Sequence, residues 1–378
     1  FPVTYELGSL GASGDLAPLA HLALGLMGEG QCRYQQKTVP TGEALQQAGV
    51  EPIVPGPKEG LSLINGTHFM TVLAAHAVER AKILMRSADV ISALSLDAVR
   101  GTYAAFDQRI QGVRGQPGQV TVASNLRQLY AVEDEIVSSH ADCNKVQDPY
   151  SFRCVPQVHG ATRDTVNYVD GVVERELNSV TDNPLVFNNG DVLSGGNFHG
   201  QPIALAMDFL AIAAAELGNI SERRIEKITN PHLSGLPPFA TKDSGINSGL
   251  MIPHVVAAAL VSENKTLAHP ASVDSIPTSA NQEDHVSMGP IAARKALQII
   301  DNVGHVLGIE LLSAVQGINL LAPLKPGRYL QAICEEVREM SPELDEDRCL
   351  HEDIGKVTEW IKAGKMLATL DAVGFQVQ

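Results

Sequence analysis

The sequence of 378 residues contains few aromatic side chains and few positive charges. Phe, Trp and Tyr make up only 4% of it, so the hydrophobic core must be built mainly from aliphatic residues. Lys and Arg number 28 against 43 Asp and Glu, a formal net charge of −15, and no Lys/Arg-rich run interrupts this acidic background. This balance argues against nucleic acid and membrane surfaces as partners and favours a small molecule.

Paired cysteines and long uninterrupted apolar runs are also missing. The five cysteines are Cys32, Cys143, Cys154, Cys334 and Cys349. They are scattered and form no C-x-x-C pair, which is typical of reduced thiols in the cytoplasm rather than of a disulfide framework. Asp208 and Glu216 interrupt the longest apolar runs, so we expect no transmembrane helix. The chain begins at Phe1 without a methionine, and we expect it to lack an N-terminal part.

Apolar residues recur at helical spacing along most of the chain. Long helices are expected at residues 66–100, as one helix or two in series, and at about 156–180, 201–229, 248–267 and 287–320. A helix of thirty residues is about 45 Å long, and an aliphatic face of that length needs parallel partners. The pattern therefore predicts a mainly α protein built as a long-helix bundle, with few or no strands. The Gly/Pro-rich connectors between the helices, including residues 182–200 and 270–282, are long enough to suggest functional loops.

The run GSLGASGDLAPLAH, residues 8–21, is the most unusual segment. A nucleophile elbow, G-x-S-x-G, would need glycine where this chain has Asp15. The spacing of Gly8, Gly11 and Gly14 matches neither the dinucleotide fingerprint nor a phosphate loop. A glycine-rich loop before a helix explains the second half of the run, because Asp15 can cap a helix and Pro18 fits its first turn.

Ala12-Ser13-Gly14 needs a chemical explanation. If a tight turn brings the Gly14 nitrogen onto the Ala12 carbonyl carbon, a five-membered ring can close. Loss of two waters, one of them from Ser13, then leaves an exocyclic methylene group. Glycine is needed because a side chain would crowd the attack and restrict the turn. The product is an electrophile of a kind that ordinary side chains cannot supply.

The run from Ala12 to His21 resembles the prosthetic-group segment of the aromatic amino acid ammonia-lyases and aminomutases, whose electrophile is 4-methylidene-imidazol-5-one (MIO). Four further segments match that family in the same order: Asn65-Gly-Thr67, Gln147-Asp-Pro-Tyr-Ser-Phe-Arg153, Ser194-Gly-Gly-Asn-Phe-His199 and Ser279-Ala-Asn-Gln-Glu-Asp-His-Val-Ser-Met288. The resemblance runs from the first residues to about Pro323.

The resemblance implies a helical bundle of the ammonia-lyase (fumarase/aspartase-like) type. Residues 1–60 would then be a remnant of the N-terminal domain, with the prosthetic-group loop, a helix and a connector, and residues 61–378 would form the bundle. It also implies a cytoplasmic homotetramer whose sites are shared between subunits. MIO would be the prosthetic group, with no external cofactor and no metal.

Site residues carry over from the matching segments. Ala12, Ser13 and Gly14 would be the MIO precursor, and Arg153 would clamp the substrate carboxylate, because its fork meets a carboxylate with two hydrogen bonds. The alternative for Arg153 is a surface salt bridge. The remaining implied site residues are Asn65, Gln147 and Tyr150, which would contact the substrate and the prosthetic group, with Tyr150 counted as catalytic, and Phe198 and Met251, which would form apolar walls. Core packing is an equal alternative for the last two. The family's catalytic tyrosine and a further histidine lie upstream of the prosthetic group, outside this chain.

Glu283 distinguishes between substrates. The segment Asn281-Gln-Glu-Asp-His-Val-Ser-Met288 resembles that of the histidine-specific lyases of the family. A carboxylate facing an imidazole makes a charge-assisted hydrogen bond, whereas against a benzene ring it would be desolvated and unpaired. The resemblance thus implies deamination of L-histidine to trans-urocanate and ammonia. The alternatives are a tyrosine or phenylalanine lyase or aminomutase on the same scaffold, or an inactive helical fragment.

Overall fold

The computed structural model describes residues 1–142 and 145–378. The chain divides into two compact units that each take three stretches of sequence. Unit 1 comprises Phe1–Ala77, Tyr168–Phe209 and His269–Leu297, and unit 2 comprises Val78–Asn167, Leu210–Ala268 and Gln298–Gln378. These units do not test the division expected at residue 60, which stays a prediction.

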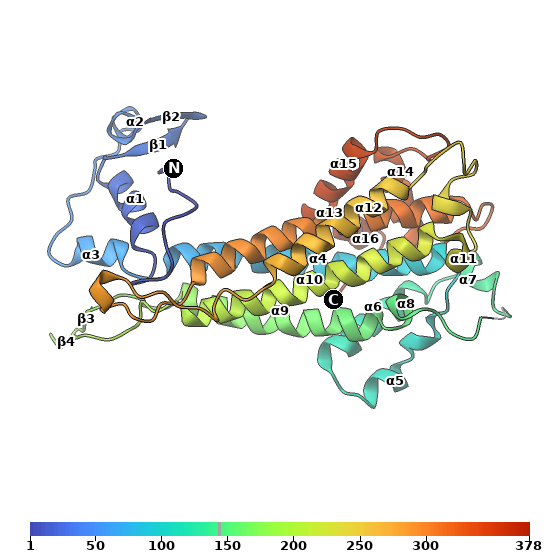
Figure 1. The fold of residues 1–378 in the computed structure, drawn as a ribbon, viewed down its shortest axis with the longest axis horizontal. Helices are drawn as coiled ribbons and strands as arrows, with labels where there is room; N and C mark the ends of the chain where they lie inside the picture. Colours follow the sequence, from blue (N-terminus) through green and yellow to red (C-terminus); the bar gives the residue numbers. More distant parts are fainter. Residues whose placement is uncertain (143–144) are drawn as a thin grey trace. The chain divides into compact units, whose positions relative to one another are not determined.

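Long helices dominate the architecture (Figure 1). They are α4 (His68–Ala98), α9 (Val155–Leu177), α10 (Gln201–Thr229), α12 (Met251–Leu267) and α13 (Gly289–Asn319). Each end lies within three residues of the predicted one, so the prediction of five long helices is confirmed. All but α12 contribute residues to both units.

Unit 2 packs parts of these helices around an aliphatic core. Ile225 of α10, Ala257 of α12, and Val306 and Ile309 of α13 form one buried cluster. The shorter helices of this unit are η1 (Tyr103–Phe106), α5 (Gln108–Gly112), α6 (Pro117–Leu129), α7 (Glu135–Ser138), α8 (Tyr150–Arg153), α11 (Pro231–Ser234), η2 (Pro238–Ala240), α14 (Arg328–Met340), α15 (His351–Lys362) and α16 (Lys365–Ala372). The low aromatic content of the sequence is thus compensated by Ile, Val, Leu and Ala at the helix contacts.

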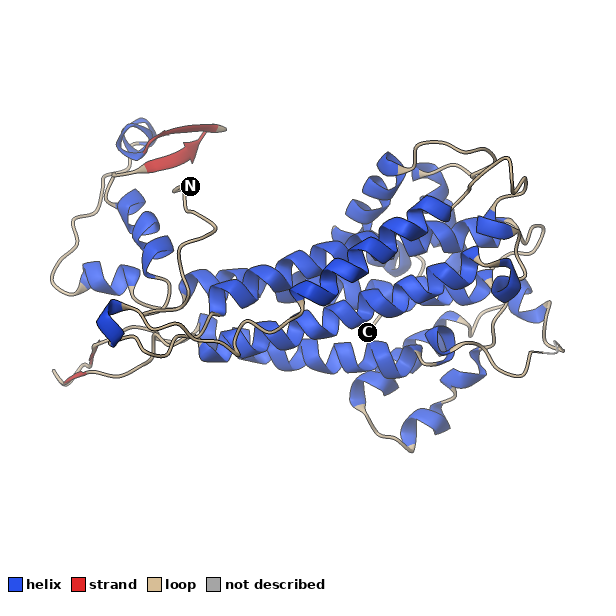
Figure 2. Cartoon of the chain, viewed as in Figure 1, coloured by secondary structure: helices blue, strands red, loops and turns tan. Residues whose placement is uncertain are grey.

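Unit 1 contains the short elements near the N-terminus and both hairpins. Its elements are α1 (Leu16–Leu26), β1 (Gln31–Tyr34), β2 (Lys37–Pro40), α2 (Thr41–Ala48), α3 (Glu59–Ile64), β3 (Leu185–Val186), β4 (Val192–Leu193) and η3 (Ser279–Asn281). The strands pair as two antiparallel hairpins, β1–β2 and β3–β4, and Figure 2 shows how little of the chain they occupy. The prediction of a mainly helical protein with few strands is confirmed.

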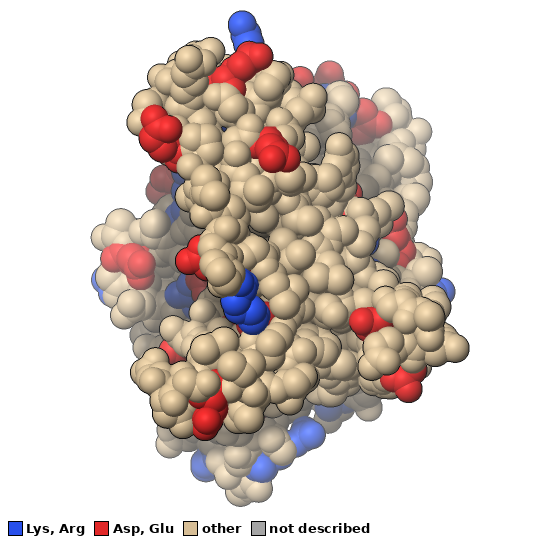
Figure 3. Space-filling model, turned by 90° about the vertical axis from the view of Figure 1, so that its left-hand side faces the viewer, with Lys and Arg blue, Asp and Glu red and all other residues tan. Residues whose placement is uncertain are grey.

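α10 is long and apolar enough to cross a membrane by length and composition alone. However, 61% of its apolar window is buried inside the structure, as expected for a core helix. On the face drawn in Figure 3, acidic side chains stand as separate groups among uncharged residues. Of the cysteines, Cys32, Cys154, Cys334 and Cys349 are free thiols, and Cys143 lies outside the described residues.

A fully buried ion pair lies in the core of unit 2. Arg224 of α10 and Glu310 of α13 are both 0% exposed, and Arg224 donates two hydrogen bonds to the carboxylate, with Nε–Oε1 at 2.5 Å and Nη2–Oε2 at 2.9 Å. The hydroxyls of Ser95 and Ser221 donate to the same carboxylate. Two charges taken out of water are tolerated only with such complete pairing.

We predict that Arg224→Met destabilises the protein by about 3–5 kcal/mol, because it leaves Glu310 buried without its counter-ion. The double variant Arg224→Met/Glu310→Met should recover most of that loss, since it removes both charges. Denaturant unfolding measures the difference. Arg109→Met, which breaks an exposed pair with Asp107, serves as the control. Equal stability of Arg224→Met and wild type would contradict the role assigned to the pair.

Candidate active site

The segment that precedes α1 forms a tight turn. Ser13 (φ 49°) and Gly14 (φ 75°) both adopt left-handed backbone conformations, and the Gly14 nitrogen donates to the Gly11 carbonyl oxygen at 3.3 Å. The Ser9 hydroxyl lies beneath the turn, where it donates to the Gly14 carbonyl and accepts from the Gly11 nitrogen. A tight turn is therefore present at Ala12-Ser13-Gly14.

Gly66, from the second matching segment, holds this turn by backbone hydrogen bonds. The Asp15 nitrogen donates to the Gly66 carbonyl at 2.8 Å, and the Gly66 nitrogen donates to the Ser13 carbonyl at 3.2 Å. We call this pair of bonds the Gly66 clasp. A Cβ atom on Gly14 would lie 2.0 Å from the Gly66 oxygen, so only glycine fits there.

Asp15 takes a different role from the one predicted. It occupies the N-cap position of α1, but its side chain makes no capping bond to that helix. Instead its carboxylate accepts from the Met70 nitrogen in the first turn of α4, at 2.9 Å, and from the Ser9 hydroxyl at 3.0 Å. The prediction of a local cap was wrong because the clasp turns the carboxylate toward α4. Burial raises the pKa of Asp15 to about 6, although these hydrogen bonds oppose the change.

The last matching segment also reaches the turn. The Met288 nitrogen donates to the Leu10 carbonyl at 2.9 Å, and Ser287 lies so close to Gly11 that a Cβ atom there would be 2.3 Å from its Oγ. Gly200, which follows the Ser194–His199 segment, similarly packs against Ser287 and Met70. Unit 1 thus brings together four of the five segments singled out in the sequence.

Glu283 lies at the end of a tight loop. The Thr278 nitrogen donates to the Glu283 carbonyl at 3.0 Å, and the three residues 279–281 all have positive φ. Such a run of left-handed residues stores backbone strain and is common at functional sites. The Glu283 Oε2 atom is shielded from solvent and has no hydrogen-bond partner in the described part of the chain.

Phe198 and Asn65 also lie in unit 1. Phe198 is half-buried and is followed by His199, whose ring stacks on His285 with centroids 5.4 Å apart. The two rings share a close nitrogen–nitrogen contact of 3.3 Å. Asn65 is buried and directly precedes Gly66 of the clasp. Among the described residues, no group of three or more His, Cys, Asp or Glu is arranged to hold a metal ion.

The other predicted residues belong to unit 2. The Arg153 guanidinium lies over the Tyr150 ring, 4.5 Å from its centroid, at the two ends of α8. Arg153 Nε is buried without a partner, and no ion pair of residues 1–142 and 145–378 includes this arginine. Gln147 is exposed just before α8, and Met251 is half-buried at the start of α12. No hydrogen bond or ring contact in the described ranges joins either of them to the Tyr150–Arg153 pair.

Buried charges of unit 2 extend to α8. Arg224 donates a long hydrogen bond, 3.4 Å, to the carbonyl of Ser151, and it lies equally far from His159 Nε2. Because arginine can only donate, His159 must accept at Nε2 and donate from Nδ1 to Asp89, 2.9 Å away. Burial lowers the pKa of His159, which keeps the imidazole neutral.

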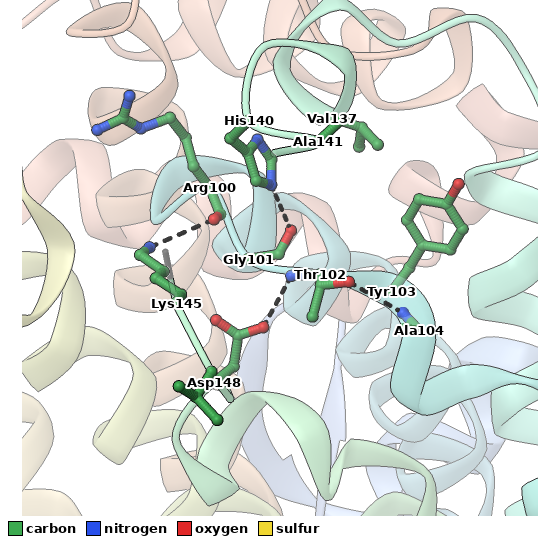
Figure 4. Close-up of a pocket in the computed structure, with 11 residues that line it drawn as sticks. Arg100, Gly101, Thr102, Tyr103, Ala104, Val137, His140, Ala141, Lys145 and Asp148 are labelled. Atoms are coloured by element: carbon green, nitrogen blue, oxygen red, sulfur yellow. Dashed lines mark hydrogen bonds between the residues drawn. The ribbon is translucent and has the colours of Figure 1, made fainter. Parts of the chain in front are cut away.

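A cavity of about 540 Å³ lies in unit 2 next to the Gln147–Arg153 segment (Figure 4). Asp148 accepts from the Thr102 nitrogen at 2.7 Å, and His140 Nε2 lies 2.9 Å from the Gly101 carbonyl. Lys145 donates to the carbonyls of Val99 and Arg100. These side chains satisfy backbone groups that follow α4, and none of the predicted site residues lines this cavity.

Sequence reasoning missed several residues that support the site. They are Ser9, Asp182, Ser287 and Arg224. A signal exists for Asp182, since the connector that begins there, residues 182–200, is longer than usual. None existed for Arg224, because a buried arginine within a helical pattern looks like any polar residue on an exposed face.

Comparisons with known proteins agree on one family. Residues 1–339 match the family model described as aromatic amino acid lyase. A protein named histidine ammonia-lyase from Sorangium cellulosum is 54% identical over 375 residues, which cover 97% of this chain and 73% of that protein. The crystal structure of histidine ammonia-lyase from Trypanosoma cruzi is 48% identical with a TM-score of 0.91, covering 98% of this chain and 70% of that one. A tyrosine aminomutase from Streptomyces globisporus is 37% identical with a TM-score of 0.93, covering 100% and 75% respectively. The predicted ammonia-lyase fold is confirmed.

The raised pKa of Asp15 makes a prediction about stability. The folded state holds the proton of the Asp15 carboxyl group more tightly than the unfolded state, in which the pKa of Asp15 is near 3.8. The resulting stabilisation is fully present below that value and is lost as the pH rises through about 6, a loss of roughly 3 kcal/mol. Asp15→Asn should flatten the decline of the unfolding free energy between pH 4 and 7, as measured by denaturant unfolding. Asp191→Asn, at an exposed acid, is the control, and parallel profiles of wild type and Asp15→Asn would contradict the prediction.

Proposed function

This chain belongs to the aromatic amino acid lyase family, and on that premise we propose that it removes ammonia from L-histidine to give trans-urocanate. The family uses an MIO prosthetic group, which supplies an electrophile toward the α-amino group of the substrate. The reaction must also break a β-carbon–hydrogen bond, so a positioned base and a clamp for the substrate have to accompany that electrophile.

Ala12-Ser13-Gly14 is the segment that we propose as the source of MIO. The fit is supported by the absence of a Cβ at Gly14, where one would collide with the Gly66 oxygen, and by the left-handed backbone at Ser13. The Gly66 clasp holds the two peptide groups on either side of Gly14 in a turn. Gly14 also lies two residues before α1, and the partial positive charge at the start of that helix would strengthen an electrophile formed here.

Glu283 provides the observation that favours histidine. Its Oε2 atom is shielded from water and unpaired among the described residues, which is costly unless a ligand supplies a donor. An imidazole N–H is such a donor, whereas the ring of phenylalanine has none. A tyrosine or phenylalanine lyase or aminomutase remains the alternative function on this scaffold, and a tyrosine aminomutase is among the similar structures.

Arg153 and Tyr150 are proposed to act at the other end of the substrate. Arg153 Nε lacks a partner in the described ranges, so its fork is free to meet the substrate carboxylate with two hydrogen bonds. The Arg153 guanidinium lies over the Tyr150 ring, and we propose that the Tyr150 hydroxyl takes part in proton transfer next to the bound carboxylate. Gln147 and Asn65 are proposed to contact the polar groups of the substrate, and Phe198 is proposed as an apolar wall.

Met251 is proposed as a second apolar wall, and its helix also supports an assembly of subunits. Three apolar side chains of α12 are largely exposed in the single chain: Ile252 at 59%, Val255 at 56% and Val256 at 41%. An exposed apolar face of this kind favours burial against another subunit. We propose a cytoplasmic homotetramer whose sites are shared between subunits.

The direct test is to incubate the full-length protein with L-histidine and to follow the absorbance of urocanate. Mass spectrometry of the peptide Gly8–His21 should show the loss of two waters, and Ser13→Ala should abolish that loss together with most of the activity. An intact peptide mass, or full activity of Ser13→Ala, would refute the proposed prosthetic group. Cinnamate or coumarate from the aromatic amino acids without urocanate from histidine would refute the substrate.

Glu283→Gln tests the substrate assignment separately. The amide keeps the shape but removes the charge, so kcat/KM for L-histidine should fall about 10- to 100-fold, the loss expected for a charge-assisted bond of 1.5–3 kcal/mol. Discrimination between histidine and phenylalanine should narrow, because the phenylalanine ring has no donor for the carboxylate. Asp284→Asn, at the exposed neighbouring acid, is the matched control. An unchanged ratio of kcat/KM for the two amino acids would contradict the assignment.

A further inference from the structure

The Asn65 side chain is held by Asp182 and Asn183, two residues to which the proposed function assigns no role. Its side-chain nitrogen Nδ2 donates to Asp182 Oδ1 at 2.9 Å and to the Asn183 carbonyl at 3.0 Å. Both partners can only accept, so the NH2 group must face them and the amide cannot be turned over. Both N–H bonds of the amide are thereby used within the protein.

The Asn65 carbonyl oxygen, Oδ1, is left available. It accepts no hydrogen bond from the described residues, although the Asn65 side chain as a whole is buried. Asn65 is also adjacent to Gly66, whose clasp holds Ser13 and Asp15 on either side of Gly14. An unused acceptor is therefore held next to the turn that we propose as the source of MIO.

Asp182 is itself held by several donors. Lys58 and Ser62 donate to its Oδ2, Ser62 at 2.7 Å, while the Asn183 nitrogen donates to its Oδ1 at 2.6 Å. Burial alone would raise the pKa of Asp182, but the hydrogen bonds from Lys58, Asn65 and Ser62 outweigh it and lower the pKa to about 2. Asp182 is therefore ionised at neutral pH, and its charge is neutralised by Lys58.

The three side-chain donors lie in and around α3. Lys58 is the N-cap residue of this helix, Ser62 lies within it and Asn65 is its C-cap residue. All three donate to the Asp182 carboxylate. The arrangement stiffens α3 and with it the direction of the Asn65 amide.

We propose that Asp182 is a positioning residue, which orients Asn65 so that the carbonyl oxygen of its amide, and not its NH2 group, is presented to the α-amino group of the substrate. This inference rests on the proposed function, because it takes Asn65 to lie at the amino end of an amino acid. It assigns Asn65 the role of a hydrogen-bond acceptor. It also assigns the Lys58–Asp182 pair a purpose beyond stability.

An exchange of the two side chains tests the proposal in the full-length protein. Asn65→Asp places a carboxylate against Asp182 and the Asn183 carbonyl, so kcat/KM for L-histidine should fall at least 100-fold. In Asn65→Asp/Asp182→Asn, the new amide can donate to the new carboxylate, whose outer oxygen again faces the substrate as an acceptor. The double variant should recover at least tenfold of the lost kcat/KM. The recovery is expected to be partial because the bond to the Asn183 carbonyl is not replaced.

Two further readouts separate positioning from a structural role. The mass of the peptide Gly8–His21 and the thermal unfolding midpoint are measured for every variant, with Asp191→Asn in the β3–β4 turn as the control. Asp182→Asn should lower kcat/KM about 10- to 100-fold, as is common when the partner of a site residue is removed. The two-water mass loss should persist, and the midpoint should shift far less than the activity.

The outcomes distinguish this proposal from the proposed function. Recovery of activity in the double variant would support the acceptor role, because aspartate at position 65 can accept a hydrogen bond but cannot donate one. A double variant as inactive as Asn65→Asp, with peptide mass and unfolding midpoint unchanged, overturns the acceptor role. If wild type converts tyrosine or phenylalanine but not histidine, only the choice of substrate fails. The activity of Asn65→Asp/Asp182→Asn is then measured with the amino acid that wild type converts, because histidine, tyrosine and phenylalanine share the α-amino group. No turnover of any of these amino acids by wild type overturns both proposals.

Discussion

The Gly66 clasp is the constraint on which the proposed site depends. It consists of only two backbone hydrogen bonds, yet it holds the turn at Gly14, directs the Asp15 carboxylate toward α4 and places Asn65 beside the turn. Its geometry leaves no room for a Cβ atom at Gly14. Two segments far apart in the sequence, one at Gly14 and one at Gly66, are therefore held together, and the segment that ends at Met288 joins them through the Leu10 carbonyl.

The long helices could be predicted from the sequence because their apolar faces repeat over many turns. The prolines that four of them contain lie in the first turn, where the missing N–H costs no hydrogen bond. The hairpin β1–β2 could not be predicted. Its turn places Gln35 and Gln36 at positive φ, where glycine or asparagine is the usual signal. Glutamine carries no such signal, so the tertiary setting and not the local sequence determines this turn.

The sequence motifs predict the chemistry of the candidate site but not the residues that hold the site in place. The motifs named the residues that would touch a substrate, and the structure brings those at Ala12-Ser13-Gly14, Asn65, Phe198 and Glu283 into one unit. Tyr150 and Arg153 come together on α8. The residues beneath them, Asp182 and Arg224, act through pairings more than 80 residues apart in sequence.

The loop that carries Glu283 is tied at both ends through main-chain atoms. The Thr278 nitrogen meets the Glu283 carbonyl at one end, and the Met288 nitrogen meets the Leu10 carbonyl at the other. Main-chain bonds do not depend on which side chain they flank. The residue at position 283 can therefore be exchanged while the path of the backbone is kept. A change of the side chain that we propose to select the substrate therefore leaves intact the main-chain bond between this loop and the segment that precedes α1.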